Sequence, residues 1–196
     1  MRKLLTTMMS VALLGPASLA FAAEASDATQ LQYAKHDQAG EQHARQAVAD
    51  LKKADPGLMR LFDEAAGYAV FATVGKGAVG VGGAHGTGLL YEKGAMVGKV
   101  TLTQLTVGLA LGAQAYTEVV FFETEKALAD FKKGEVTLAA QVSAVVVKAG
   151  ASASAKYIDG MSVFTHVKGG VMAEASVGGQ KFGFQPYLKA ITVNDR

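Results

Sequence analysis

The sequence predicts an α+β domain whose larger part is a mostly antiparallel, strongly curled or barrel-like β-sheet, with two N-terminal helices and one short inserted helix. Helical spacing of apolar residues is confined to residues 41–66 and 124–133. Most of the remaining chain from residue 67 onward alternates apolar residues with small or polar ones, as strands do. Nine glycines within residues 75–98, set among Val, Ala and Leu, indicate short strands, tight bends and bulges.

The N-terminal residues have the pattern of a secretory signal peptide. Arg2 and Lys3 precede an apolar stretch, and Ala20-Phe21-Ala22 offers the small side chains of a cleavage site. We therefore expect residues 1–22 to be a cleaved signal, residues 23–40 a flexible lead-in, and residues 41–196 a single domain. The signal resembles a bacterial one, so we expect the periplasm as the location. The absence of cysteine excludes disulfides and thiol chemistry.

The charge balance gives no argument for a nucleic-acid partner. The chain has 19 basic and 17 acidic residues, and loss of Arg2 and Lys3 with the signal leaves 17 of each. A nearly neutral mature chain has no general attraction for polyanions. Any attraction to an anionic partner must come from local clusters of lysine.

Three helices are expected. The first covers residues 41–54, with Ala44, Ala47 and Leu51 on one face. The second starts at Asp55-Pro56, with Asp as N-cap and Pro in the first turn, and ends at Gly67. The third has Thr124 as its cap and Gly134 as its stop. The apolar faces of the first two are short and their polar faces are not rich in lysine, so we expect packing on the sheet and not on a membrane.

Alternation predicts ten strands, at residues 68–74, 78–83, 88–92, 95–103, 105–113, 117–123, 136–155, 161–167, 171–177 and 181–187. Residues 136–155 hold the longest alternation. In residues 105–113, Leu and Val at odd positions alternate with Thr106, Gly108 and Ala110, so the two faces of this strand differ in bulk.

The sequence does not predict an enzyme, a cofactor or a metal site. The four histidines lack metal-ligand spacing, and no serine lies in a nucleophile elbow. The glycines of residues 75–80 match a dinucleotide fingerprint in letters, but the required helix does not follow. An unrecognised envelope hydrolase using Glu118, Glu174 or His85 stays open as an alternative.

The placement of lysine suggests a lipid site. Lys76, Lys93, Lys99 and Lys168 lie beside glycine turns or at strand ends, and His85 lies in a glycine loop. Together they would form a basic rim around a sheet mouth, suited to the phosphate of a lipid head group. The alternative is that these lysines only keep strand edges soluble.

Several motifs resemble the SYLF-domain family over residues 44–186. They are Gly67-Tyr-Ala-Val-Phe, Gly80-Val-Gly-Gly-Ala-His-Gly-Thr-Gly, residues 104–114, Glu118-Val-Val-Phe-Phe and residues 168–181. The resemblance implies binding of anionic lipids; some eukaryotic members are also associated with actin bundling. For an exported protein it implies bacterial phospholipid or a similar amphiphile in place of phosphoinositides.

The leading hypothesis is an exported, non-catalytic lipid-binding protein whose partner is an anionic lipid or membrane surface and not nucleic acid. Small side chains on an inner sheet face would leave room for an acyl chain. The structural alternative is a solid protein without a ligand cavity, in which the small faces let two sheets pack closely. Such a protein would act by pairing with another envelope protein.

Overall fold

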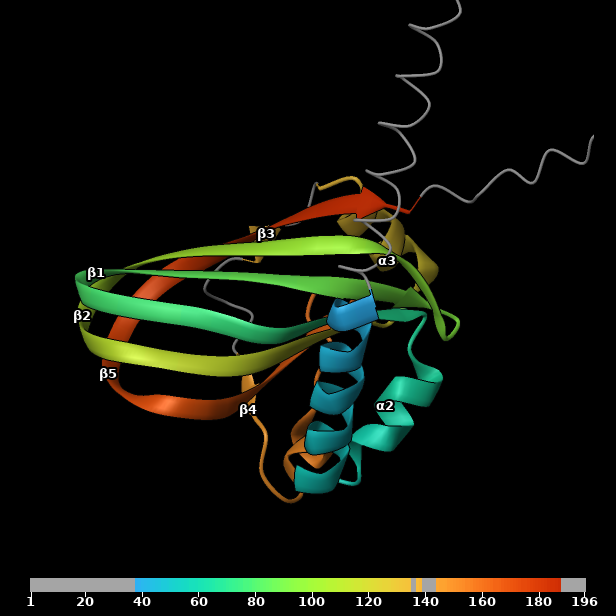
Figure 1. The fold of residues 1–196 in the computed structure, drawn as a ribbon, viewed down its shortest axis with the longest axis horizontal. Helices are drawn as coiled ribbons and strands as arrows, with labels where there is room; N and C mark the ends of the chain where they lie inside the picture. The colour runs from blue at the N-terminus through green and yellow to red at the C-terminus, as the bar shows by residue number, and fades with distance from the viewer. Residues whose placement is uncertain (1–37, 135–136, 139–143, 188–196) are drawn as a thin grey trace, which may run out of the picture. The chain divides into compact units, whose positions relative to one another are not determined.

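The computed structural model describes residues 38–134, 137–138 and 144–187. The chain divides into two units, and nearly all described residues belong to the unit Gly40–Arg196. A first helix covers residues 38–54. The other elements are α2 (Leu58–Glu64), β1 (Gly67–Glu92), β2 (Ala95–Phe122), α3 (Glu125–Lys132), β3 (Thr137–Leu138), β4 (Val145–Val146), the 3-10 turn η1 (Ala151–Ser154) and β5 (Met161–Pro186) (Figure 1).

Five strands form one mixed sheet. Its order is β1-β2-β5-β3, with antiparallel pairs throughout, and β4 pairs with β5 in parallel. The α+β class and the three helices are confirmed. The expected mostly antiparallel, strongly curled or barrel-like sheet is confirmed only in part. The parallel pair of β4 and β5 makes the sheet mixed, and the strand order is an open path and not a closed barrel.

Three long strands replace most of the short ones expected from the sequence. Residues 67–92 form one strand, as do residues 95–122 and 161–186, because the glycines bend the chain without breaking the ladder. Gly80 has a φ of 75° and Gly112 a φ of 129°, values that residues with a Cβ rarely adopt. The register of β1 against β2 also shifts between Val79 and Val81. The three strands therefore bend at mid-length, on the left of Figure 1.

The two halves of β1 face each other closely. A Cβ placed on Gly86 would lie 2.8 Å from Cγ2 of Val74, and one placed on Gly88 would clash with the carbonyl oxygen of Val70. A Cβ on Gly82 would lie 2.8 Å from Cβ of Ala78 in β1 and would clash with Oγ1 of Thr106, its partner on β2. The room for an acyl chain expected from the small residues is therefore not found at these positions. The glycines instead let the two halves pack closely.

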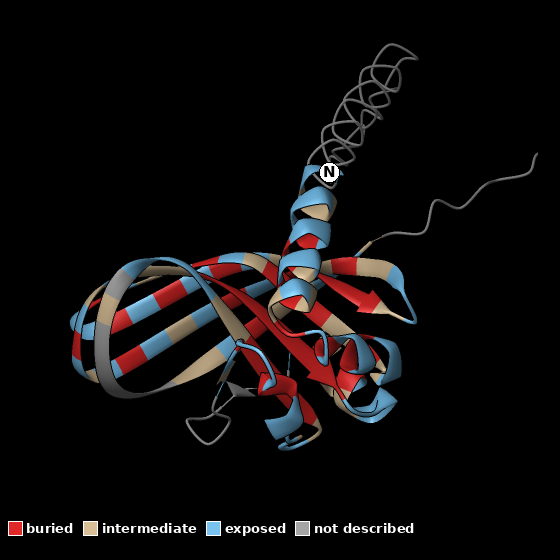
Figure 2. Cartoon of the chain, turned by 90° about the horizontal axis from the view of Figure 1, so that it is seen from below, coloured by how far each residue is buried: buried red, intermediate tan, exposed pale blue. Residues whose placement is uncertain are grey.

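Two apolar cores lie on the two faces of the sheet, at the ends of the long strands away from the bends. The inner core lies on the concave side of the bent sheet and includes Phe71, Leu102 and Phe122. The outer core joins Leu51 and Phe62 of the two helices to the sheet, where the Phe62 and Phe121 rings meet edge to face at 4.8 Å. The helices therefore pack on the sheet, as expected. Figure 2 shows buried residues concentrated near the helices and alternating with exposed ones toward the bends.

Two local expectations need correction. Asp55 does not cap α2, whose N-cap is Gly57; its carboxylate accepts from Gly57 N at 3.1 Å and from Ser152 N at 2.6 Å, so it joins the helix junction to η1. The long strand expected over residues 136–155 is also wrong. The described part of that stretch holds β3, β4 and η1, and Gly150 turns the chain with a φ of 79°. The remaining part, residues 135–136 and 139–143, lies outside the described residues.

Candidate functional site

Large apolar side chains are exposed where β1 and β2 bend. Six of them, between 62% and 83% exposed, form what we call the apolar bend surface: Val79, Val81, Leu105, Val107, Leu109 and Leu111. The register places Val79 opposite Leu111 and Val81 opposite Val107, so side chains of the two strands are neighbours on the same face. Continuous exposed apolar surface of this kind marks an interaction site in a folded protein.

The opposite face of the same strands carries the small residues. Thr106 and Ala110 are buried at 3% and 8% exposure, while their bulky neighbours in sequence face solvent. This arrangement follows from the close approach of the two strand halves, which leaves space inside only for glycine, alanine and threonine. The two faces differ in side-chain size, as expected from the sequence. The large side chains face solvent, and the small ones pack inside the bent sheet.

Basic side chains border the apolar bend surface. Thr103 of β2 pairs with His85 of β1 on one side and with Lys181 of β5 on the other, and this row directly follows the row of Leu105. His85 and Lys181 are exposed. Lys99 lies two rows further along the same face, half-buried opposite Leu89. Because paired residues share a face of a sheet, these three side chains lie on the side of the apolar residues.

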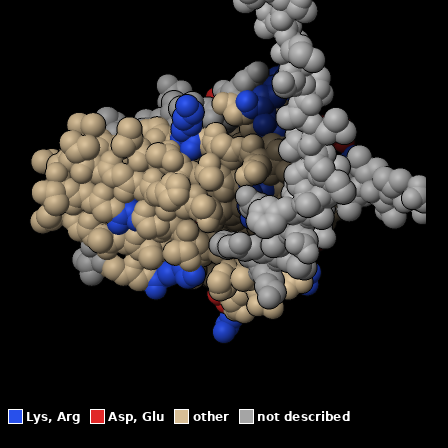
Figure 3. All heavy atoms as spheres, turned by 45° about the horizontal axis from the view of Figure 1, so that its top comes forward, with Lys and Arg blue, Asp and Glu red and all other residues tan. Residues whose placement is uncertain are grey.

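Acidic residues are absent from most of β1 and β2. None occurs between Glu64 and Glu92 or between Glu92 and Glu118. On the face shown in Figure 3, the left part, where the strands bend, has scattered basic atoms among uncharged ones and no acidic ones. The apolar bend surface and its border therefore suit a partner that is apolar in part and anionic or neutral elsewhere.

The structure does not bring the five expected site residues into one rim. His85 borders the apolar bend surface, and Lys99 lies further along the same face of β2. Lys93 lies in the turn after β1 and forms an ion pair with Glu125 at 3.1 Å. Lys168 donates from Nζ to the carbonyl oxygen of Ala72 at 3.2 Å and to Oγ1 of Thr73 at 3.0 Å.

Lys76 is half-buried and pairs with Gln114, alternating with the outward-facing residues of β1. Lys181 was not expected in the site. Its link to His85 depends on the register of β5 against β2, for which the sequence holds no local signal.

A polar chain crosses the inside of the bent sheet. Glu118 is fully buried, and its Oε2 accepts from Nε2 of Gln180 at 3.0 Å. Gln104 Oε1 lies 3.4 Å from both Gln180 Nε2 and the hydroxyl of Tyr116. Burial raises the pKa of Glu118 to about 7, against the lowering effects of the Gln180 hydrogen bond and the charge of Lys76.

The candidate hydrolytic residues do not converge in the described structure. Glu118 is enclosed and meets no solvent, whereas His85 is exposed on the other face of the sheet. The side chain of Glu174 lies outside what is described. Within residues 38–134, 137–138 and 144–187, no three His, Asp or Glu side chains gather as metal ligands. Over the same residues, no helix has the length and apolar character needed to cross a bilayer.

Residues 103–187 match the model of the Ysc84 family, described as Las17-binding protein actin regulator. This segment of the chain is therefore similar to the Ysc84, or SYLF, family. The match confirms the resemblance found in the sequence, and the family is associated with lipid binding and actin regulation. The matched segment contains the Leu105–Leu111 part of the apolar bend surface and the bordering Lys181. No curated protein matches the chain.

Proposed function

We propose that this protein binds lipid membranes through the apolar bend surface, with His85, Lys99 and Lys181 beside the head groups. The observation that carries the proposal is the side-by-side exposure of six large apolar side chains on β1 and β2. The SYLF family of the matched segment supports it, since lipid binding is associated with that family. Nothing in this proposal requires catalysis.

Transfer of the exposed apolar side chains from water into the bilayer interface would supply the free energy of binding. Burying one Val or Leu side chain stabilises a complex by about 1.5–3 kcal/mol, so six of them supply enough to hold a protein at a bilayer interface after the costs of association. Lys99 and Lys181 each add about 1 kcal/mol near an anionic surface. Contact at the surface is favoured over carriage of a lipid inside, because Gly82, Gly86 and Gly88 lie against neighbouring atoms.

We further propose that the membrane in question is that of a bacterial envelope. The signal-like N-terminus, with Arg2 and Lys3 before an apolar stretch, supports export. Anionic phospholipids such as phosphatidylglycerol are then the natural head groups for His85, Lys99 and Lys181. Actin would not be met in that compartment.

The test is flotation of the protein with vesicles of phosphatidylcholine alone and with added phosphatidylglycerol. The double variant Leu109→Gln and Leu111→Gln should reduce the bound fraction on both vesicle types by at least roughly tenfold, the equivalent of about 1.4 kcal/mol. Val146→Gln is the matched control, because Val146 is also exposed, at 58%, but lies on β4. Equal flotation of the double variant and the wild type would overturn the proposal.

A second candidate function is that of an envelope interaction protein with a solid core. The close packing at Gly82, Gly86 and Gly88 favours it over a lipid carrier. In that case the apolar bend surface would meet protein, and the wild type would stay at the bottom of the flotation gradient with both vesicle types. Sedimentation velocity would then show self-association that the double variant loses, if the partner is a second copy.

A further inference from the structure

We propose that Glu118 is a proton-operated latch between the two halves of the bent sheet: protonated, it holds them together, and ionised, it loosens them. The latch is a property of the folded chain alone and does not depend on the proposed lipid function.

The geometry places Glu118 between the halves. It lies near the end of β2, opposite Phe71 of β1 and Thr165 of β5. Its hydrogen-bond partner Gln180 belongs to the other half of β5, where it pairs with Gln104 near the start of β2. The bond from Gln180 to Glu118 therefore spans the interior and joins segments that the bends bring face to face.

The surroundings suit a protonated carboxyl better than a carboxylate. Oε1 of Glu118 is buried and has no hydrogen-bond partner among the described residues, and the same is true of Oγ1 of Thr106 on the same inner face of β2. A buried carboxylate with one unbonded oxygen carries a large desolvation cost. A protonated carboxyl avoids most of that cost and can still accept from Gln180.

One described cation acts on Glu118. It is Lys76, which reaches it from β1 and is itself half-buried. From β5 the facing group is the neutral amide of Gln180, and on β2 the nearest titratable member of the polar chain is Tyr116, two residues away on the same face. Burial raises the pKa of Glu118 to about 7, and the charge of Lys76 opposes part of that rise. The carboxyl therefore changes its protonation state near neutral pH.

The glycine-containing bends allow the two halves of the sheet to move apart. Gly80 and Gly112 take backbone conformations available mainly to glycine, and the register shift between Val79 and Val81 lies at the same place. Loosening at these points lets water reach the ionised carboxylate, and its pKa then returns toward its ordinary value of 4.5. Deprotonation is thereby coupled to local separation of the halves.

The experiment is hydrogen exchange of the full protein followed by mass spectrometry, with rates corrected for the intrinsic pH dependence of exchange. Between about pH 5 and about pH 8, the opening equilibrium of peptides from β1 and the second half of β5 should rise roughly tenfold to a hundredfold. Glu118→Gln should remove this rise. Glu123→Gln is the matched control, because Glu123 is an exposed glutamate five residues further along and should leave the rise unchanged.

A second pair of variants tests whether Gln180 and Lys76 set the pH at which the two halves separate. Gln180→Met and Lys76→Met each remove an influence that lowers the pKa of Glu118, so each should shift the midpoint of the transition to higher pH. A merely structural role of Glu118 predicts lower protection at every pH with no shift of midpoint. An unchanged pH dependence in Glu118→Gln, or unmoved midpoints in the Met variants, would overturn the proposal.

Discussion

At the scale of single residues, burial decides what Glu118 can do. The carboxyl has one hydrogen bond, from Gln180, and no contact with solvent. Burial raises its pKa to about 7 from the ordinary value of 4.5, so the folded state binds a proton more tightly than the unfolded chain. The free energy of unfolding must therefore depend on pH in the window between these two values.

The stabilising contribution of Glu118 should be complete below about pH 4.5 and should be lost as the pH rises to about 7. The loss amounts to about 3 kcal/mol at most, from about 1.36 kcal/mol for each unit of pKa difference. Denaturant titrations across this range measure it directly. Glu118→Gln mimics the neutral acid, so its curve should lack this fall and should exceed that of the wild type above pH 7. A fall of equal size in both proteins would assign the effect to other groups.

A second prediction at this scale concerns the glycines between the strand halves. Gly88→Ala should lower the free energy of unfolding by about 1–3 kcal/mol, because a methyl group there clashes with the carbonyl oxygen of Val70. Gly75→Ala is the matched control, since a Cβ on Gly75 meets no atom within 4 Å. Urea unfolding of the two variants gives the comparison. Equal midpoints would mean that the halves lie further apart than described.

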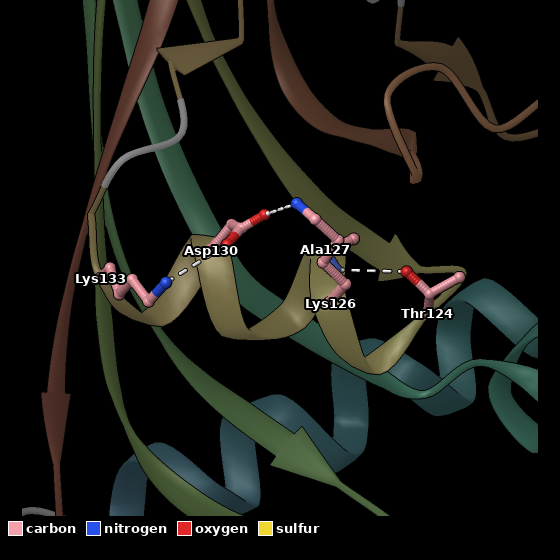
Figure 4. A network of polar contacts seen from close by, with 5 residues as sticks. All are labelled: Thr124, Lys126, Ala127, Asp130 and Lys133. Carbon is pink, nitrogen blue, oxygen red and sulfur yellow. Dashed lines mark hydrogen bonds and ion pairs between the residues drawn. The ribbon is translucent and has the colours of Figure 1, made fainter.

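At the scale of elements, the ends of α3 were predictable because capping is local, although the same reasoning wrongly made Asp55 the cap of α2. Thr124 accepts from the Ala127 N–H at 3.2 Å, and Gly134 ends the turn after α3 with a φ of 72°. Figure 4 shows this cap together with the pairing of Asp130 to Lys126 at 2.6 Å and to Lys133 at 3.5 Å. The exposed pairs add little, whereas the cap satisfies a backbone donor that α3 leaves open.

Thr124→Ala should therefore destabilise the protein by about 1 kcal/mol, and Thr124→Ser should restore most of this loss. Lys126→Ala, which removes the exposed ion pair with Asp130, should change the free energy of unfolding by about 0.5 kcal/mol or less. Thermal unfolding of the three variants provides the measurement. A larger effect for Lys126→Ala than for Thr124→Ala would contradict this ranking.

Strand ends and pairing could not be predicted in the same way. A glycine such as Gly80 permits either the end of a strand or a bend within one, and only the partner strand decides between them. The register that sets Lys181 beside Thr103 and His85 joins residues far apart in the chain. The alternation of residues 136–155 predicted a long strand, yet in the described part of that stretch β4 pairs with β5 over Val145 and Val146 alone. Alternation shows which residues would share a face, but not whether a neighbouring edge is available.

At the scale of the whole molecule, apolar residues have two separate roles. The inner and outer cores hold the sheet and helices together, and Leu102 and Phe121 within them are fully buried. The apolar bend surface lies outside both cores. The alternation in residues 105–113 was visible in the sequence, but the lipid was expected at its small face. The pattern of a single strand does not show which face meets the other half of the sheet.

Leu109→Gln should consequently leave the free energy of unfolding within about 0.5 kcal/mol of wild type, because its side chain is already 83% exposed. Leu102→Gln places an amide in the inner core at a site with 0% exposure and should cost at least about 3 kcal/mol or prevent folding. Circular dichroism melts separate the two cases. A strong loss of stability in Leu109→Gln would show that its side chain is packed and is not available to a membrane.

In the bent part of β2, the exposure of each side chain depends on whether its residue number is odd or even. Between the row of Leu105 and the row of Leu111, a residue's place in solvent or interior follows solely from whether its number is odd or even. Deleting a single residue such as Gly108 would exchange inside for outside along half of β2. An insertion of two residues would preserve that assignment, so this hairpin should tolerate length changes by even steps far better than by odd ones.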